Sequence, residues 1–325
     1  MPARIVGTGM GVPKNVVSNE ALSPRLGVSP SWIEQRTGIR QRYLLSEGES
    51  LLGIAVTAAK DALHTAGIAP ESLDAVLVGT VSSELSFPSF ACQLQGALNA
   101  HHATAFDVSA ACCGFVYSVA VADQFIRSRE WRTALVLGVD ALSTMVSWDD
   151  PATAAVFGDG AAAVVLVRDN GADGIMKTAL GSDGRLGGLV QARSKGVEPR
   201  YDSTEARPRE NTIFMHGPEL FKIATKSMTH AAIEVLKRSG LCLSDVSVLV
   251  PHQANARIIA AVCERLGLPI CKAFMNIDLY GNTSAASVPL ALHDAVERKR
   301  ITRGDIVMLD AFGGGLTWGA CLCRW

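Results

Sequence analysis

The chain has 325 residues, of which 48% are hydrophobic and 30 are glycine. This composition is typical of a compact α/β protein and excludes a disordered or fibrous chain. Thirty lysine and arginine residues balance 31 acidic residues, so the net charge is −1. Because nucleic acids and anionic membranes attract strongly basic proteins, this balance predicts neither as a partner.

The N-terminal stretch MPARIVGTG lacks the features of a secretion signal. No apolar run approaches the roughly 20 residues that span a bilayer. The eight cysteines form no CxxC pair, and the seven histidines do not fall at ligand spacing with them. We therefore expect a cytoplasmic protein with reduced thiols and no metal site.

Apolar periodicity predicts strands that alternate with helices along the first half of the chain. The expected strands are residues 3–9, 74–81, 103–109, 133–142 and 161–169. The expected helices are residues 50–67, 88–99 and a long helix that follows the cysteine pair at 112–113.

The second half repeats this outline. Its expected helices are residues 219–240, 255–267 and 284–299, and its expected strands are 246–252, 305–312 and 318–325. Such alternation favours mostly parallel sheets with helices on their faces. We therefore expect two related α/β halves, residues 1–175 and 176–325. Residues 176–211 would connect them, and the polar part from about 182 to 211 would form a lid or a surface connection.

Two adjacent cysteines, Cys112 and Cys113, lie where the strand 103–109 gives way to a helix. The positive end of a helix dipole and its unpaired N–H groups favour a thiolate and can hold an oxyanion. Successive helical residues point about 100° apart, so only one of the two can face a given cleft. The alternative is that both are small buried hydrophobic residues. This stretch alone leaves the choice open.

A histidine and an asparagine lie at two further loop edges. His252, in VPHQAN, follows a buried-looking strand, and ligand clefts of α/β sheets open at such strand ends. Asn282 lies in the turn LYGNTSAASVP before a helix. Taken singly, each has a structural alternative, a core histidine and a helix cap. Together with a cysteine, they indicate thiol nucleophile chemistry.

Two enzyme classes use these residue types. The order Cys, His, Asn is also that of papain-like thiol hydrolases, but the CG[SA]C[WY] signature is missing. The other class forms carbon–carbon bonds on thioesters, where the cysteine carries an acyl group and two donors stabilise an enolate without a metal. Nucleotide and dinucleotide binding are disfavoured, because neither DAFGGGLTWG nor GTGMG completes the required glycine motif. A third possibility is a non-catalytic scaffold, which has no need to keep all three residues.

Seven motifs in fixed order extend over essentially the whole chain. They are WIEQRTGIRQR (32–42), FPSFACQLQ (87–95), AACCGF (110–115), FGDGAAAVVL (157–166), VPHQAN (250–255), YGNTSAASVPLAL (280–292) and FGGGLTWGA (312–320). With this set the sequence resembles the β-ketoacyl-acyl-carrier-protein synthase III family of the thiolase superfamily. The resemblance implies a thiolase-like fold, with two similar halves in a five-layered α/β/α/β/α arrangement, and a homodimer.

The resemblance also assigns the chemical centre. Cys112 would be the nucleophile, and Cys113 a packed neighbour at a position that is usually Ala. His252 and Asn282 would bind the malonyl thioester carbonyl and assist decarboxylation.

Two residues near the C-terminus would support this centre. Phe312 would keep the site apolar and so favour loss of the carboxylate. The backbone N–H groups of Cys112 and Gly314 would form the oxyanion hole.

The implied reaction is acetyl transfer from acetyl-CoA to the cysteine, then condensation with malonyl-acyl-carrier protein to acetoacetyl-acyl-carrier protein and CO2. This reaction initiates fatty acid synthesis, and acyl-CoA and carrier protein are substrates, with no cofactor. The alternative is a related condensing enzyme that uses another acyl primer for polyketide or quinolone-type metabolism.

The remaining implied roles concern substrate binding. Trp32 and Arg36 would meet the adenine and phosphates of CoA, and Asn255 the pantetheine arm. Two departures weaken this grip on CoA. Pro151 stands where the family usually has an arginine opposite the tryptophan, and Pro218 replaces a usual asparagine.

Three further residues would face other partners. Phe87 would lie near the far end of the acyl pocket across the dimer, where a bulky ring favours a short primer. Lys222 and Arg257 would form a basic rim for the acidic carrier protein, although ordinary surface charge is the alternative.

Overall fold

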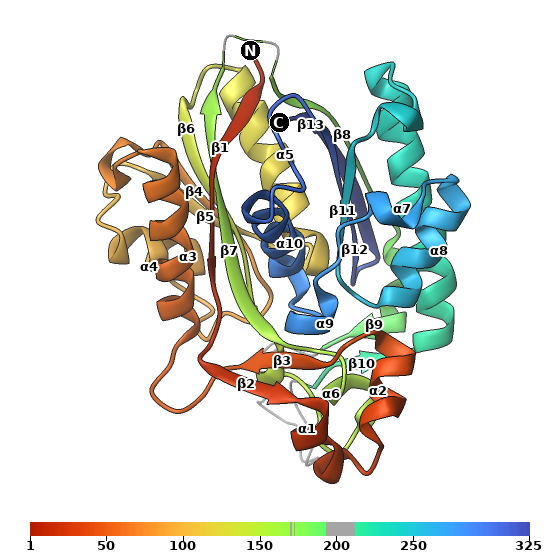
Figure 1. Cartoon of the computed structure of the whole chain (residues 1–325). Helices are drawn as coiled ribbons and strands as arrows, with labels where there is room; N and C mark the ends of the chain where they lie inside the picture. The colour runs from red at the N-terminus through yellow and green to blue at the C-terminus, as the bar shows by residue number, and fades with distance from the viewer. Residues whose placement is uncertain (170, 172, 193–211) are drawn as a thin grey trace.

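The computed structural model describes residues 1–169, 171, 173–192 and 212–325. Helices and sheets alternate in five layers (Figure 1). The helices of these layers are α3 (Leu51–Ala66) and α4 (Phe90–Ala97) on one outside, α5 (Gly114–Arg127) and α10 (Ser287–Glu297) in the centre, and α7 (Gly217–Ser239) and α8 (Ala256–Leu266) on the other outside. The five-layered thiolase-like arrangement predicted from the resemblance is confirmed.

The first sheet has the strand order β1-β7-β6-β4-β5. Its strands are β1 (Ala3–Gly11), β4 (Ala75–Gly79), β5 (Thr104–Val108), β6 (Thr133–Ala141) and β7 (Asp159–Arg168). The second sheet has the order β8-β13-β12-β11. Its strands are β8 (Gly174–Ser182), β11 (Val248–Pro251), β12 (Ile306–Gly313) and β13 (Thr317–Arg324).

The two sheets are built alike. Each has parallel pairing on one side, β4 with β6 in the first sheet and β11 with β12 in the second, and β5 also pairs parallel with β4. The strands beyond it, β7 and β1 or β13 and β8, pair antiparallel. An isolated parallel bridge from Leu249 to Ala273 stands where β5 pairs with β4 in the first sheet. The expectation of mostly parallel sheets is therefore wrong. Strand pairs such as β12 and β13 follow each other without a crossover helix, and a parallel pair needs one.

Strand β8 corrects the expected connection over residues 176–211. It pairs with β13 along its length, from Gly174 to Ser182, and so belongs to the second sheet. The short strands β9 (Val190–Gln191) and β10 (Phe214–Met215) pair with each other after it. Most of the polar segment expected as a lid or surface connection, residues 193–211, lies outside the described residues.

Capping residues set the helix starts that periodicity left uncertain. Ser89 accepts a hydrogen bond from the N–H of Cys92, so α4 begins at Phe90 and Pro88 lies before the helix. Helix α3 ends at Gly67, whose φ of 65° is the left-handed conformation of a helix C-terminus. The expected helix 284–299 begins as a 3₁₀ turn, η7 (Ser284–Ala286), before α10.

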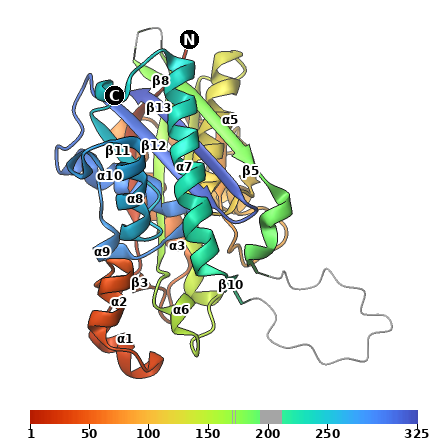
Figure 2. The ribbon, with the colours of Figure 1, turned by 90° about the vertical axis from the view of Figure 1, so that its right-hand side faces the viewer.

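The central helices are buried between the two sheets. Phe115, Val116 and Val119 of α5 and Leu292 of α10 are fully buried in one core. This explains why the sequence after the cysteines is small or apolar on nearly every face. Helices α7 and α8 cover the outer face of the second sheet (Figure 2).

A smaller region lies at the end of the molecule opposite the two termini (Figure 1). Its elements are β2 (Asn15–Ser18), α1 (Asn19–Leu26), α2 (Pro30–Thr37), β3 (Gln41–Leu44), α6 (Pro151–Ala154) and α9 (Ile277–Tyr280). Within the described ranges, no helix has both the length and the apolarity to cross a bilayer.

Candidate active site

The two cysteines lie in a 3₁₀ turn, η2 (Ala111–Cys113), that joins β5 to α5. Cys112 is half-buried and lines a pocket of about 620 Å³. Cys113 is fully buried in the core between the sheets. The geometry therefore leaves Cys112 as the thiol of this pair that a ligand in the pocket can reach.

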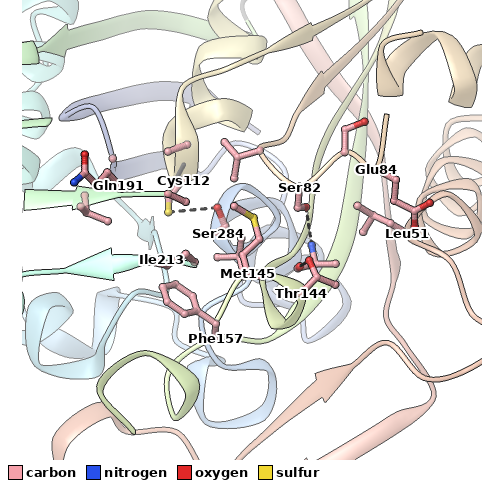
Figure 3. Close-up of a pocket in the computed structure, with 18 of the residues that line it drawn as sticks. Leu51, Ser82, Glu84, Cys112, Thr144, Met145, Phe157, Gln191, Ile213 and Ser284 are labelled. Carbon is pink, nitrogen blue, oxygen red and sulfur yellow. Dashed lines mark hydrogen bonds between the residues drawn. The ribbon is translucent and has the colours of Figure 1, made fainter. Parts of the chain in front are cut away.

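Residues from both halves of the chain line this pocket (Figure 3). They are Leu45, Leu51, Val81, Ser82, Ser83, Glu84, Ser86, Ala111, Cys112, Ala141, Leu142, Thr144, Met145, Phe157, Val190, Gln191, Ala192, Ile213, Ser284 and Gly314. Most of them follow strand ends, where the sequence analysis placed the cleft.

The turn that carries Cys112 is held by close packing. A Cβ on Gly313 would lie 2.7 Å from the Cys112 nitrogen, so only glycine fits where β12 ends against η2. Ala111 and Ser284, on either side of the thiol, have φ angles of 47° and 53°. Such left-handed conformations cost free energy in residues other than glycine and gather at functional sites. The position of the sulfur is thus fixed by the surrounding structure.

Asn282 is linked to Cys112 through Ser284. The Ser284 hydroxyl donates to the Cys112 sulfur over 3.4 Å, as the dashed line in Figure 3 shows. The Ser284 N–H donates to the Asn282 carboxamide oxygen over 2.9 Å. Because the oxygen is engaged, the Asn282 amide group keeps its N–H donors for a ligand. Ser284 was missed by the sequence analysis, although it lies in the quoted motif around Asn282.

His252 follows β11 and is 2% exposed. Its Nδ1 lies 2.5 Å from the Ser287 hydroxyl oxygen at the start of α10. That oxygen also accepts a hydrogen bond from the N–H of Gln253, so its own proton is available to Nδ1. We assign the imidazole proton to Nε2 from this pattern of hydrogen bonds. Burial lowers the pKa of His252 to about 3, so His252 is a neutral N–H donor.

The Cys112 thiol is protonated in this state. Burial raises the pKa of Cys112 to about 11, and the hydrogen bond from Ser284 opposes the shift only in part. The nearby Asp140 carboxylate raises it further. Burial thus opposes the thiolate that a helix terminus favours, because the charged sulfur would lose its hydration.

Two other predicted residues lie around this centre. Phe312, on β12, is 8% exposed and packs against Leu220, Ala224 and Met228 of α7. Gly314 follows β12 and lines the pocket beside Ala111. His252, Asn282 and Phe312 are nearly buried and do not line the pocket of the described structure.

The predicted CoA-binding residues lie on α2 and at the N-cap of α8. The Arg36 guanidinium stacks over the Trp32 ring, 4.6 Å from its centre. Asn255 caps α8 by accepting from the Arg257 N–H over 2.9 Å, and its amide nitrogen donates to the Arg36 carbonyl. Asn255 thus joins α2 to α8. These residues lie outside the pocket lining.

The other predicted contacts are on the surface of this chain. Phe87 is 85% exposed and does not line the pocket, although neighbouring residues 81–84 and 86 do. Lys222 on α7 and Arg257 on α8 are both exposed. The Arg257 guanidinium lies 5.9 Å from the Phe221 ring, which brings the two cationic side chains to adjacent helices.

Comparison with known proteins decides the family. Two family models, described as 3-oxoacyl-[acyl-carrier-protein (ACP)] synthase III and its C-terminal part, match residues 106–184 and 236–325. A protein of Aquifex aeolicus named beta-ketoacyl-[acyl-carrier-protein] synthase III is 43% identical over 325 residues, which is 100% of both chains. The chain belongs to the β-ketoacyl-acyl-carrier-protein synthase III family. As a member it is an acyltransferase, a condensing enzyme with the thiolase fold.

Other relatives of this family agree. A protein of the same name from Bacillus pumilus is 42% identical and is covered to 99%, with 100% of this chain. The crystal structure of the synthase III from Aquifex aeolicus superposes with a TM-score of 0.93 over 99% of this chain and 100% of its own. The priming β-ketosynthase of the R1128 polyketide pathway superposes with a TM-score of 0.92 at 32% identity, over 99% of this chain and 96% of its own.

Proposed function

We propose that this synthase III starts fatty acid synthesis by joining acetyl-CoA to malonyl-acyl-carrier protein. The observation that carries the proposal is one reachable thiol, Cys112, that lines the pocket and is linked through Ser284 to Asn282. Ser287 holds His252, the second neutral N–H donor, at the start of α10. The products are CoA, CO2 and acetoacetyl-acyl-carrier protein.

In the first half-reaction, the Cys112 sulfur attacks the acetyl carbonyl and the CoA thiolate leaves, taking up the proton that Cys112 loses. The backbone N–H groups of Cys112 and Gly314 hold the oxyanion between these events. The close approach of Gly313 to the Cys112 nitrogen supports this pairing of the two turns. Because burial raises the pKa of Cys112 to about 11, the free enzyme carries the protonated thiol, so the proton has to leave the sulfur during acetyl transfer.

In the second half-reaction, the malonyl carboxylate leaves as CO2, and its electron pair forms an enolate on the thioester. Nε2–H of His252 and the amide N–H of Asn282 donate to the enolate oxygen. The enolate carbon then attacks the acetyl carbonyl, and the Cys112 sulfur leaves. The apolar ring of Phe312 disfavours the charged carboxylate and so favours its loss. No metal or cofactor enters either half-reaction.

Surface residues indicate which proteins the enzyme binds, a second copy of itself and the carrier protein. Phe87 is a large apolar side chain that is 85% exposed in the single chain. Such exposure supports a homodimer in which the ring is buried and closes the partner's acyl pocket. A phenyl ring at that place favours a short primer such as acetyl. Lys222 and Arg257 form the basic rim for an acidic carrier protein. The enzyme would work in the cytoplasm.

The mass of the intact protein after mixing with acetyl-CoA tests the proposal. The wild type and Cys113→Ser are expected to gain one acetyl group, and Cys112→Ser none. Addition of malonyl-acyl-carrier protein should then discharge the adduct with formation of acetoacetyl-acyl-carrier protein. A wild type that takes up only longer or branched acyl groups would point instead to the alternative primer. An adduct that persists in Cys112→Ser would overturn the assignment of the nucleophile.

A further inference from the structure

Two tryptophans, each with an arginine stacked on it, lie in one region beside the pocket. Trp148 follows the pocket wall 141–145, and the Arg25 guanidinium of α1 lies 4.6 Å from the centre of its ring. Trp32 of α2 carries Arg36 at the same distance. Both tryptophans pack against one apolar cluster at the end of the molecule where α1, α2 and α6 lie (Figure 1).

This cluster is continuous with the pocket of Cys112. Met145, Phe157 and Ile213 belong to the cluster and also line the pocket. The Ile213 N–H donates to the Met145 carbonyl over 2.7 Å, which ties these two walls together. A ligand that leaves the pocket along these residues therefore meets the paired tryptophan and arginine side chains.

Arg25 and Arg36 carry charges that no carboxylate of the described residues neutralises. Within that part of the chain neither guanidinium forms an ion pair, whereas nearby Arg40 binds Glu34 over 2.8 Å. Both arginines are exposed, and Trp148 is only half-buried. Planar cations stacked on aromatic rings offer flat faces to a purine and N–H groups to phosphates. The region thus suits a ligand with both.

Asp150 lies next to this region, but its carboxylate is engaged in hydrogen bonds at the start of α6. Its carboxylate accepts hydrogen bonds from the Ala152 N–H over 2.9 Å and from the Thr153 hydroxyl over 3.0 Å. Pro151 follows it as the first residue of α6 and carries no donor. The position that is usually an arginine in the family therefore gives nothing to an anionic nucleotide here.

We propose that Trp148 and Arg25 bind the nucleotide end of CoA, its adenine and phosphates, together with Trp32 and Arg36. They replace the arginine contact to CoA that the family resemblance implies at position 151, where this chain has Pro151. The proposal rests on the proposed use of acetyl-CoA, and it assigns to Trp148 and Arg25 a role in the choice between donors with and without a nucleotide.

Calorimetric binding of CoA and of 4′-phosphopantetheine, which lacks the nucleotide, tests the proposal without any chemistry. Base stacking on an aromatic side chain leads us to expect a rise of about tenfold in the Kd of CoA for Trp148→Ala. The Kd of 4′-phosphopantetheine should not change. Trp148→Phe keeps a stacking face and should bind CoA within about threefold of the wild type. Arg25→Gln should raise the Kd of CoA and leave the Kd of 4′-phosphopantetheine unchanged.

The matched control is Arg298→Ala. It removes another exposed guanidinium that lies over an aromatic ring, 5.7 Å from the centre of Phe274, away from the pocket lining. Its Kd values should equal those of the wild type. An equal rise in the Kd of both ligands in Trp148→Ala would overturn the proposal. An unchanged Kd of CoA in Trp148→Ala would overturn it as well. So would a wild type that binds both ligands equally.

The acetylation experiment separates this proposal from the proposed function. A wild type that binds CoA through Trp148 but gains no acetyl group at Cys112 would remove the proposed function and leave the nucleotide site. Acetylation with equal efficiency by acetyl-CoA and acetyl-phosphopantetheine would support the proposed function and overturn the nucleotide site.

Discussion

Replacement of Ser287 by alanine tests how the protein holds His252 as a donor. The Ser287 hydroxyl lies 2.5 Å from Nδ1 of a ring that is 2% exposed. Without it, a buried ring nitrogen has no partner, which costs about 1 to 3 kcal/mol. That energy now favours the tautomer with its proton on Nε2 and fixes the direction of the N–H.

The loss should fall on the condensation step. We expect a decrease of about 10- to 100-fold in the rate at which acetylated enzyme reacts with malonyl-acyl-carrier protein, because each 1.4 kcal/mol is a factor of about ten. Acetylation of Cys112 should stay within about threefold, since no contact joins Ser287 to the sulfur in the described structure. Single-turnover measurements of the two half-reactions, by intact mass, separate these rates.

Two variants serve as controls for this experiment. Ser287→Thr keeps a hydroxyl and should restore most of the rate. Ser118→Ala removes another buried serine hydroxyl, which donates to the Gly114 carbonyl within α5, and should leave the condensation rate unchanged. An unchanged rate in folded Ser287→Ala, or an equal loss in both half-reactions, would refute the role given to Ser287.

Three other predictions concern stability and assembly. The pKa of His252 is about 3 in the folded protein and 6.5 in the unfolded chain, so its contribution is present above pH 6.5 and lost as the pH falls toward 3. Urea unfolding should show a loss of about 2 kcal/mol from pH 7 to pH 5 that His252→Gln lacks; parallel curves would contradict it. Gly79→Ala places a Cβ 2.4 Å from the backbone of Gly114 and should destabilise the fold by about 2 kcal/mol or more, whereas Gly96→Ala, in open space on α4, should stabilise it by about 0.5 to 1 kcal/mol. Thermal melts of both compare them, and a Gly79→Ala protein as stable as the wild type would count against this close approach of the two backbones. Phe87→Asp should turn a dimer into a monomer in sedimentation experiments, and a wild type that is already monomeric would exclude the proposed interface.

The sequence predicted the elements that carry the chemistry because their signals are local. Cys112, His252 and Asn282 each lie where an apolar run meets a helix or turn, and the structure has the same boundaries within a few residues. The motifs also predicted the family and the layered fold. In contrast, β8 was missed, because half-exposed residues interrupt its apolar pattern and its partner β13 lies more than a hundred residues away.

The side chains that orient the site were also missed. Ser284 and Ser287 are ordinary small residues in the sequence, and their roles depend on Cys112, 172 residues away, and on His252, 35 residues away. The same holds for Trp148, whose partner Arg25 lies on another helix.

The sequence by itself thus determined the order of most elements and the family, and it predicted the reactive groups, since local periodicity and short motifs encode them. The periodicity around the cysteine pair left open which thiol faces the pocket, and the tertiary structure shows that Cys112 does and that burial raises its pKa. Burial and long-range hydrogen bonds set these properties, and both arise only when distant segments pack together.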